Sequence, residues 1–208
     1  MTDQHQRDGM SFVRLFFRSP VTSAFFIISV IVAISTSLGD NESSLRYVLQ
    51  ISAQTNGSLI EISQGELWRL ITPIFLHFSI LHILFNMMWL IQLGIGIEIK
   101  QSSWHLIVLI LSIAILSNLA QYYWSLNPNF GGMSGVDFGL LGYTWIIGRL
   151  NPRLGIGIDN GTVIFMLAWF ALCWSGALGA IANMAHTIGL LIGIVFALLL
   201  TIKKRSEA

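Results

Sequence analysis

The chain alternates between long apolar stretches and short polar ones, and most of the apolar stretches are close to the length that crosses a bilayer. A transmembrane helix needs about 20 consecutive apolar residues, and in lipid only a helix or a closed barrel pairs all its backbone N–H and C=O groups. We therefore expect an all-α, polytopic membrane protein, a bundle of six transmembrane helices. The six stretches lie at about residues 20–38, 79–98, 104–124, 134–149, 161–177 and 183–202.

The segments outside these stretches predict one membrane domain with short ends. Residues 1–19 are polar, residues 20–203 are expected to form the membrane domain, and residues 204–208 a tail. The run at 20–38 resembles a signal peptide, but it is long for one and further spans follow, so we expect an uncleaved first helix. Residues 39–75 mix charged side chains with Leu, Ile and Trp, which predicts a partly helical first loop at the membrane interface.

The composition agrees with a membrane protein and argues against nucleic-acid binding. The chain has 208 residues, of which 54% are hydrophobic and only 10% charged, whereas soluble domains carry about 25% charged residues. The net charge of +1 provides no basic field for nucleic acid. The single cysteine, Cys173, cannot form an internal disulfide and is expected to be a packing residue.

The distribution of basic residues predicts the orientation. Six helices place both termini on one side, and nine of the eleven Lys and Arg residues fall on that side. Because basic residues accumulate in cytoplasmic segments, we expect both termini to be cytoplasmic. The nine are Arg7, Arg14, Arg18, Lys100, Arg149, Arg153, Lys203, Lys204 and Arg205; the other two are Arg46 and Arg69.

Four polar side chains lie inside the predicted helices, where polar groups are costly and usually functional. They are His82 and Asn86 in the second helix, Ser134 at the start of the fourth and His186 at the start of the sixth. All three helices begin on the extracytoplasmic side, so the four residues fall within the first two turns of inward-running helices. Their common depth in the outer leaflet predicts one shared site.

Ser134 follows Gly131 and Gly132 at the start of its helix, and two interpretations stand side by side. A serine there can be an ordinary N-cap. It can also be a nucleophile, because the free N–H groups of a helix N-terminus stabilise the oxyanion that its attack creates. The motif alone gives both about equal weight, and they do not exclude each other.

Glycine pairs next to Ser134 and His186 predict that their two helices pack closely. A lone membrane histidine is more often bonded to a neighbouring helix, but small-xxx-small seams let two helix backbones approach closely. Two such seams, each beside one of the two residues, favour a Ser134–His186 hydrogen bond. The seams are Gly135 with Gly139 and Gly189 with Gly193.

His82 and Asn86 are four residues apart and therefore lie on one helix face. Both can donate a hydrogen bond, so together with the backbone N–H of Ser134 they could form a three-donor oxyanion hole. Taken alone, the pair would be read as interhelical hydrogen bonding worth about 0.6 kcal/mol each.

In combination, these residues resemble the rhomboid family of intramembrane serine proteases, and the bacterial GlpG-type members above all. The likeness runs from about Trp68 to the C-terminus. Gly-x-Ser-Gly alone would be a weak signal, whereas the combined pattern is specific. The matching pieces are Trp68-Arg69, His77-Phe-Ser-Ile-Leu-His82-Ile-Leu-Phe-Asn86, Gly132-Met-Ser134-Gly135 and Ala185-His186-x-x-Gly189-x-x-x-Gly193.

The resemblance implies a role for each matching residue. Ser134 would be the nucleophile and His186 the general base, with His82, Asn86 and the Ser134 N–H binding the oxyanion. The substrate groove and lateral gate would involve Gly132, Met133, Phe85, Trp89, Phe138 and Trp169. The loop at about 175–183 would cover the site as a lid, while Glu98, Arg69 and His77 would be structural.

The resemblance also implies substrates and a location. The substrates would be single-pass or other transmembrane proteins, cut near the outer end of a helix, and the protein would lie in the bacterial inner membrane with its active site opening to the extracytoplasmic side. No cofactor or metal is implied. GlpG-type members usually carry a cytoplasmic domain ahead of the first helix; nineteen polar residues cannot form one, so we expect the bare membrane core.

Two residues depart from the family pattern. Phe138 stands where relatives often have a tyrosine that packs on the catalytic histidine. Phenylalanine keeps this ring contact but lacks the hydroxyl. Asp137 lies in a normally apolar region. It suggests a catalytic triad, but a residue three positions after Ser134 would not obviously reach the far side of His186, so we expect a Ser–His dyad.

Other functions fit less well. The chain lacks a His-Glu-x-x-His zinc motif, and an aspartic protease would need a second intramembrane partner for Asp137. A catalytically inactive rhomboid-like protein that binds membrane clients is the alternative, although such proteins typically lack the serine or the histidine. A transporter or channel would spread ionisable residues through the membrane depth, whereas here they cluster in one leaflet.

Overall fold

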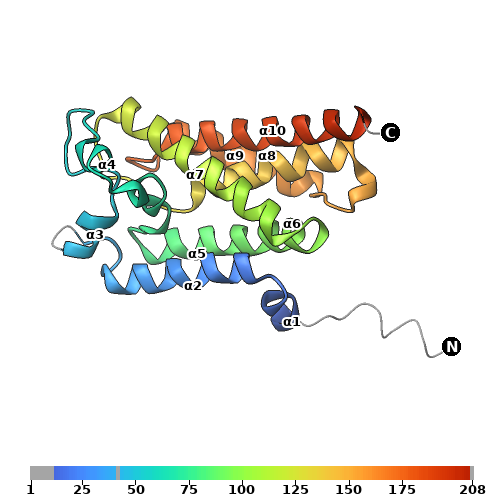
Figure 1. Cartoon of the computed structure of the whole chain (residues 1–208), viewed down its shortest axis with the longest axis horizontal. Helices are drawn as coiled ribbons and strands as arrows, with labels where there is room; N and C mark the ends of the chain where they lie inside the picture. The colour runs from blue at the N-terminus through green and yellow to red at the C-terminus, as the bar shows by residue number, and fades with distance from the viewer. Residues whose placement is uncertain (1–11, 41–42, 207–208) are drawn as a thin grey trace.

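The computed structural model describes residues 12–40 and 43–206, and all regular structure in these ranges is helical (Figure 1). Residues 1–11 of the expected N-terminal segment lie outside the described part. The longer helices are α2 (Pro20–Ser35), α5 (Ile80–Trp89), α7 (Ser103–Ser125), α8 (Ser134–Leu150), α9 (Asn160–Trp174) and α10 (Asn183–Ser206). The short ones are α1 (Phe12–Phe17), α3 (Ser44–Leu49), α4 (Ile60–Ser63), η1 (Leu67–Leu70), η2 (Thr72–Phe75), the π-helical η3 (Leu90–Gly94), α6 (Ile95–Lys100) and η4 (Pro152–Leu154). Helix α5, η3 and α6 follow one another without a break and form the segment Ile80–Lys100.

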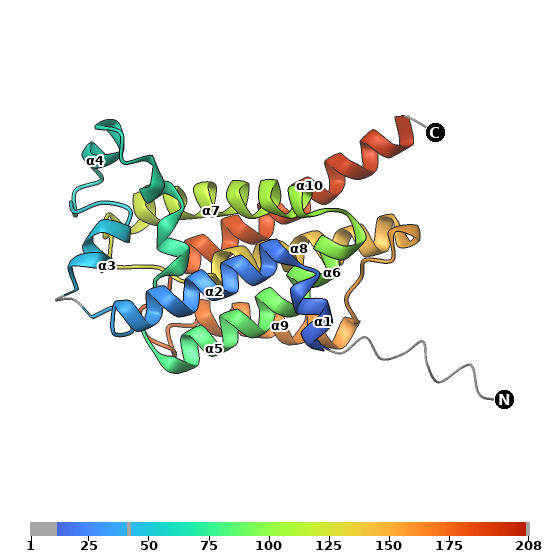
Figure 2. The ribbon, with the colours of Figure 1, turned by 60° about the horizontal axis from the view of Figure 1, so that its bottom comes forward.

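The long helices run side by side as a bundle. Helix α1 and the far end of α10 lie at one end of it, while α3 and α4 lie at the other (Figure 1). In the turned view α8 lies in the interior, with α7 and α10 on one side and α5 and α9 on the other (Figure 2). This arrangement confirms the prediction of an all-α polytopic bundle.

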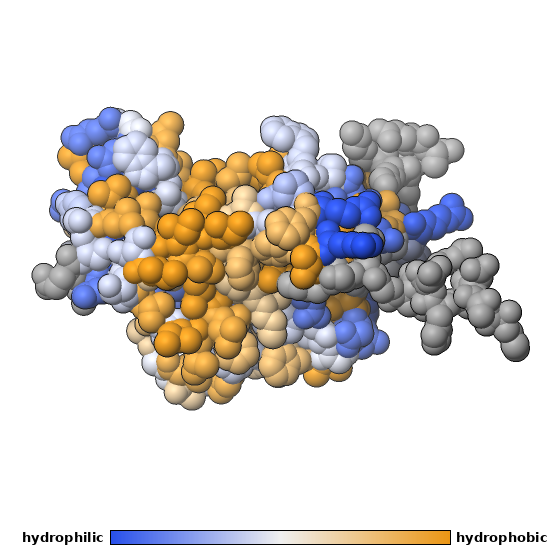
Figure 3. Space-filling model, turned by 90° about the horizontal axis from the view of Figure 1, so that it is seen from below, coloured by the Kyte–Doolittle hydropathy of each residue, from blue (hydrophilic) through white to orange (hydrophobic). Residues whose placement is uncertain are grey.

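Length and apolar composition identify the helices that can cross a membrane. Among the described residues, three segments are long and apolar enough: Ile80–Lys100, Ser103–Ser125 and Asn183–Ile202; α2 and α9 are shorter apolar helices. Many large apolar side chains are exposed on the bundle. On the face seen in Figure 3 they form a band across the middle, with polar residues gathered toward the two ends. A surface of this kind fits lipid better than water, and we describe the chain as a polytopic membrane protein.

Helix α8 is the most deeply buried helix that carries a candidate residue. From Gly135 to Thr144 every residue is buried. A Cβ on Gly189 would collide with the carbonyl oxygen of Gly135, and one on Gly193 with that of Gly139. The two glycine seams therefore face each other, and the predicted close approach of their helices is confirmed.

Helix ends differ by a few residues from the expected spans, for local reasons. Helix α2 stops at Ser35, and residues 37–39 take left-handed backbone conformations. Helix α9 stops at Trp174, ahead of the left-handed Gly176. Helix α10 continues to Ser206, so most of the expected tail extends this helix.

A buried carboxylate on α6 holds α2 in place. Glu98 is 4% exposed. It accepts hydrogen bonds from the Thr22 hydroxyl (2.8 Å), from the backbone N–H groups of Val21 and Thr22 (both 2.9 Å) and from the Ser103 hydroxyl (2.7 Å). Such a fully satisfied network agrees with the structural role expected for Glu98.

The loop between the first two long helices is partly helical, as predicted. It contains α3, α4, η1 and η2. The guanidinium of Arg69, which is 3% exposed, donates to the carbonyl oxygens of Tyr47 and Gln50 (both 2.8 Å) and pairs with Glu66. These contacts join separate parts of the loop into one ordered unit.

Candidate active site

Ser134 and His186 meet where α8 and α10 begin. The Ser134 Oγ lies 2.8 Å from the His186 Nε2, a hydrogen-bonded distance. Ser134 is the first residue of α8, and Met133 holds the N-cap position. The serine hydroxyl therefore bonds the histidine, and the interpretation of Ser134 as a simple N-cap is wrong.

Gln121, on α7, positions the start of α10. Its side-chain oxygen accepts hydrogen bonds from the backbone N–H groups of Met184 (3.1 Å) and Ala185 (3.2 Å). The first N–H groups of a helix have no acceptor within the helix, so this amide satisfies two of them directly before His186. Sequence reasoning missed Gln121, although a glutamine in an apolar span was a visible signal.

The surroundings of His186 hold the ring without a carboxylate. The Phe138 ring lies 4.8 Å from the imidazole, centre to centre. Within residues 12–40 and 43–206, the His186 Nδ1 and both carboxyl oxygens of Asp137 have no hydrogen-bond partner. Asp137 therefore does not complete a triad in this geometry.

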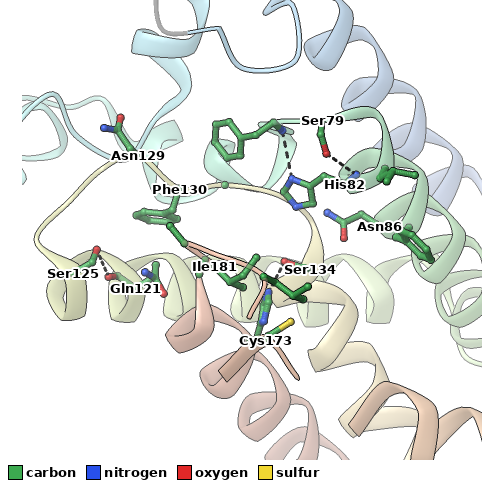
Figure 4. Close-up of a pocket in the computed structure, with 18 of the residues that line it drawn as sticks. Ser79, His82, Asn86, Gln121, Ser125, Asn129, Phe130, Ser134, Cys173 and Ile181 are labelled. Carbon is green, nitrogen blue, oxygen red and sulfur yellow. Dashed lines mark hydrogen bonds between the residues drawn. The ribbon is translucent and has the colours of Figure 1, made fainter. Parts of the chain in front are cut away.

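His82 and Asn86 lie on α5, whose start is capped by the Ser79 hydroxyl accepting from the His82 N–H (Figure 4). The His82 Nδ1 accepts a hydrogen bond from the Phe78 N–H at 3.4 Å. In a neutral imidazole whose Nδ1 accepts, the Nε2 carries the proton. Asn86 is 5% exposed, and its side-chain N–H₂ has no partner in the described part of the chain.

The Gly131-Gly132 turn brings these two donors close to the start of α8. Gly132 has a φ of +109° and donates its N–H to the carbonyl oxygen of Pro73 at 3.0 Å. A Cβ on Gly132 would stand 2.5 Å from the His82 Nε2 and 3.1 Å from the Asn86 side-chain nitrogen. Backbone conformation and space thus both require glycine at this position.

Met133 has a different place from the one the resemblance implied. Its side chain is fully buried and belongs to the main hydrophobic core, together with Phe138 and Val136. It does not lie among the residues that line the large cavity at the site. Its contribution is to anchor the turn ahead of Ser134.

A cavity of about 610 Å³ opens onto the Ser134–His186 pair (Figure 4). His82, Asn86 and Gln121 line it from α5 and α7. Residues 178 and 180–182, from the loop between α9 and α10, also line it; they belong to the segment for which the resemblance implied a lid. Small ligand sites have similar volumes, about 300–1,000 Å³.

Two aromatic contacts join α5 to α9 beside the cavity. The rings of Phe85 and Trp169 stack with centres 6.0 Å apart. One helical turn further on, Trp89 and Phe165 lie 6.1 Å apart. The residues expected at a lateral gate are therefore in mutual contact, with Phe165 as an addition that the sequence did not single out.

His77 lies beside the site but outside the spanning helices, with its ring 5.1 Å from that of His82, centre to centre. It is fully buried, and its Nδ1 donates to the carbonyl oxygen of Phe75 at 3.0 Å. Burial, with a smaller contribution from neighbouring His82, lowers the pKa of His77 to about 3. His77 is therefore neutral at physiological pH. Across the described residues no group of three or more His, Cys, Asp or Glu side chains could hold a metal ion.

Comparison with known proteins places the chain in a family. Residues 64–203 match the family model of the Rhomboid domain. The chain is 36% identical to the rhomboid protease GlpG of Salmonella paratyphi A over 189 residues, which cover 90% of this chain and 66% of that protein. It is 41% identical to the rhomboid protease GlpG of Salmonella newport over 143 residues, 68% of this chain and 51% of that protein. The matched part thus spans between about half and two thirds of these curated relatives, and the chain belongs to the rhomboid family.

Proposed function

We propose that this protein is an intramembrane serine endopeptidase that hydrolyses a peptide bond near the outer end of transmembrane helices of other membrane proteins. The observation that carries the proposal is the 2.8 Å contact between the Ser134 Oγ and the His186 Nε2 at the edge of a large cavity. A hydroxyl bonded to an imidazole is the arrangement of an activated serine nucleophile. The rhomboid proteases among the relatives support the same reaction.

In the first half of the reaction, the His186 Nε2 accepts the Ser134 proton as the Ser134 Oγ attacks the peptide carbonyl carbon. The tetrahedral intermediate collapses to an acyl-enzyme when His186 returns that proton to the leaving amine. In the second half, water attacks the acyl group with His186 again as the base. The large cavity provides a route by which water reaches Ser134.

Three donors are available for the oxyanion. They are the Ser134 N–H at the start of α8, the His82 Nε2–H and the Asn86 side-chain N–H₂. The contacts of a Cβ on Gly132 place the last two on the same side of the turn that precedes Ser134. Donors already in position before the reaction stabilise developing charge without reorganisation.

The pair works as a dyad. Because the His186 Nδ1 and the Asp137 carboxyl make no hydrogen bond to any described residue, the imidazole is oriented by other contacts. These are the Phe138 ring, which packs on it, and the start of α10, which Gln121 fixes.

The charges in the sequence support an orientation in the membrane. Nine of eleven basic residues fall on the side of the termini in a six-helix arrangement, and such a bias favours cytoplasmic termini. The protein is then a multi-pass protein of the bacterial inner membrane. Its cavity opens to the extracytoplasmic side, under the loop between α9 and α10. A substrate helix enters from lipid between α5 and α9, past Phe85 and Trp169.

The alternative is an inactive relative that binds membrane clients without cutting them. Such a protein would need neither a bonded serine–histidine pair nor unpartnered donors beside it, and both features are present. The unpartnered Asn86 amide in particular costs stability in a merely binding protein, which favours the protease.

A cleavage assay tests the proposal. Purified protein in detergent should cut a reporter carrying one transmembrane helix, and Ser134→Ala and His186→Ala should each abolish cutting. Ser125→Ala is the matched control, because Ser125 lines the same cavity but bonds the carbonyl oxygens of Gln121 and Asn127; it should retain activity. Residual cutting by Ser134→Ala would overturn the dyad, and no cutting by wild type across varied reporters would favour the client-binding alternative.

A further inference from the structure

A second, smaller cavity lies next to the first, between α5, α8 and α9. It has a volume of about 80 Å³. Ser134, Asn86, Phe85 and Trp169 border both cavities, so the small one adjoins the proposed nucleophile. Its other walls are almost entirely apolar or aromatic: Trp89, Phe138, Phe165 and Met166, with Asp137 as the exception.

Asp137 is the acidic residue in these walls. It is 2% exposed, and neither carboxyl oxygen has a hydrogen-bond partner anywhere in the described chain. Buried polar side chains are nearly always hydrogen-bonded, because leaving one unpaired forfeits its interactions with water. The acceptor capacity of Asp137 is therefore open to a group that enters the cavity.

The catalytic pair does not use this acceptor. The His186 Nδ1, the atom that the carboxylate of a triad would contact, is itself without a described partner. Asp137 and His186 also line different cavities: the small cavity is lined by Asp137 but not by His186, and the large one by His186 but not by Asp137.

The position of the cavity indicates what could fill it. Two aromatic pairs, Phe85 stacked on Trp169 and Trp89 tilted against Phe165, join the helices α5 and α9 that border it. A polypeptide that reaches Ser134 from between these helices passes the mouth of this cavity. One water needs about 10–15 Å³ of such space, so the cavity has room for a short side chain.

We propose that Asp137 is a specificity-determining residue, which accepts a hydrogen bond from a short polar side chain of the substrate next to the cleaved bond. This inference rests on the proposed protease function. The preferred side chains are those that donate and are small, such as Thr and Asn. An apolar side chain of the same shape leaves the carboxyl unpaired, and such sites discriminate strongly against ligands that lack the donor.

Matched substrates test this inference. In a reporter with one transmembrane helix, each of the residues flanking the cleaved bond is changed in turn to Thr or Val, and to Asn or Leu. At one position, wild type should cleave the Thr and Asn members about tenfold better in kcat/KM than their apolar partners. Asp137→Leu should lose or invert this preference, and Asp137→Asn should keep much of it through its amide oxygen.

Thr144→Val is the control variant, because Thr144 is a buried polar residue of the same helix whose hydroxyl bonds the carbonyl oxygens of Leu140 and Leu141. It should leave the preference unchanged. Absence of any preference in wild type, or the same preference in Asp137→Leu, overturns the inference. A ratio between two substrates does not depend on how much enzyme is folded, and the wild-type result stands even if Asp137→Leu does not fold.

Binding separates this inference from the proposed function. The same paired peptides are bound to Ser134→Ala protein in detergent, and their dissociation constants are compared. A binding preference for the donor peptides with no cleavage by wild type would reject the protease and keep the role of Asp137. Cleavage by wild type, with no preference for the donor peptides in cleavage or in binding, would keep the protease and reject the role of Asp137.

Discussion

The carbonyl oxygen of Gly135 occupies the space that a side chain on Gly189 would need. Gly135 follows Ser134 directly, and Gly189 lies three residues after His186, so this contact sets how closely the two helices approach beside the proposed dyad. The same relation repeats one turn further on, between Gly139 and Gly193. Backbone-to-backbone contact at both steps fixes α10 against α8.

Gly189→Val should therefore separate the two helices and break the hydrogen bond of the dyad. We expect loss of cleavage and destabilisation by several kcal/mol, because overpacking against a backbone atom cannot be relieved by a side-chain rotation. Thermal unfolding in detergent and the cleavage assay measure the two effects. Gly96→Ala is the control: a Cβ on Gly96 meets nothing within 4 Å, so activity and Tm should stay close to wild type.

Gly132→Ala should remove activity with a smaller effect on the global fold. At this position the backbone φ is +109°, which an alanine rarely adopts. The added Cβ would also collide with the His82 Nε2 and crowd the Asn86 side-chain nitrogen, so the substitution displaces the two proposed oxyanion donors. We expect a fall in kcat of at least about 10²-fold, with Tm lowered by less than in Gly189→Val. Gly157→Ala, where a Cβ meets nothing within 4 Å, should behave like wild type. Normal cleavage by Gly132→Ala would contradict the proposed oxyanion hole.

The polar residues in apolar stretches were the informative signal in the sequence. His82, Asn86, Ser134 and His186 all lie around one cavity, because helices that start from one side place their first turns at one depth. The all-α polytopic class also followed from the apolar pattern, since lipid leaves the backbone few alternatives. The facing glycine seams could also be predicted, because small residues four positions apart let two helix backbones approach closely.

Other features depend on contacts that the sequence does not show. Gln121 accepts hydrogen bonds from backbone N–H groups of a helix more than 60 residues away in sequence. From the sequence alone, any polar residue of α7 was an equal candidate for this contact. Met133 adjoins the nucleophile but turns its side chain into the core, because side-chain direction at a helix start depends on the local backbone. The π-helical η3 carries no pattern that distinguishes it from the helices on either side.

Replacing Asn86 should reduce catalysis more than stability. Its buried N–H₂ has no partner in the described chain, so Asn86→Ala removes no hydrogen bond from the resting protein, and Tm should change little. If Asn86 donates to the oxyanion, kcat should fall about 10²–10³-fold with little change in KM. Asn118→Ala is the contrasting control, because Asn118 donates to the carbonyl oxygen of Leu70 at 2.9 Å and should lower Tm rather than kcat. A large fall in Tm with unchanged kcat in Asn86→Ala would make Asn86 structural.

Gln121 should behave as a positioning residue. Gln121→Leu leaves the N–H groups of Met184 and Ala185 without their acceptor, so the first turn of α10 loosens around His186. We expect kcat to fall about tenfold and hydrogen exchange at residues 184–186 to rise, while Gln121→Glu, which keeps an acceptor oxygen, should recover part of the activity. The control is Gln101→Leu, which removes a pair of hydrogen bonds with Tyr143 far along the sequence from the dyad. Unchanged exchange in Gln121→Leu would argue against the positioning role.

His77 should make stability depend on pH below neutrality. Its pKa falls from 6.5 to about 3 in the folded protein, so between these values the unfolded chain binds a proton that the folded protein does not. The free energy of unfolding is then highest above about pH 6.5 and declines as the pH drops, with a slope for one proton of about 1.4 kcal/mol per pH unit. His77→Gln removes this titration, so the variant's curve should be flatter than that of wild type by about this slope between pH 6 and 4. Unfolding in detergent micelles over that range measures both curves, and parallel curves would show that burial of His77 does not cause the decline.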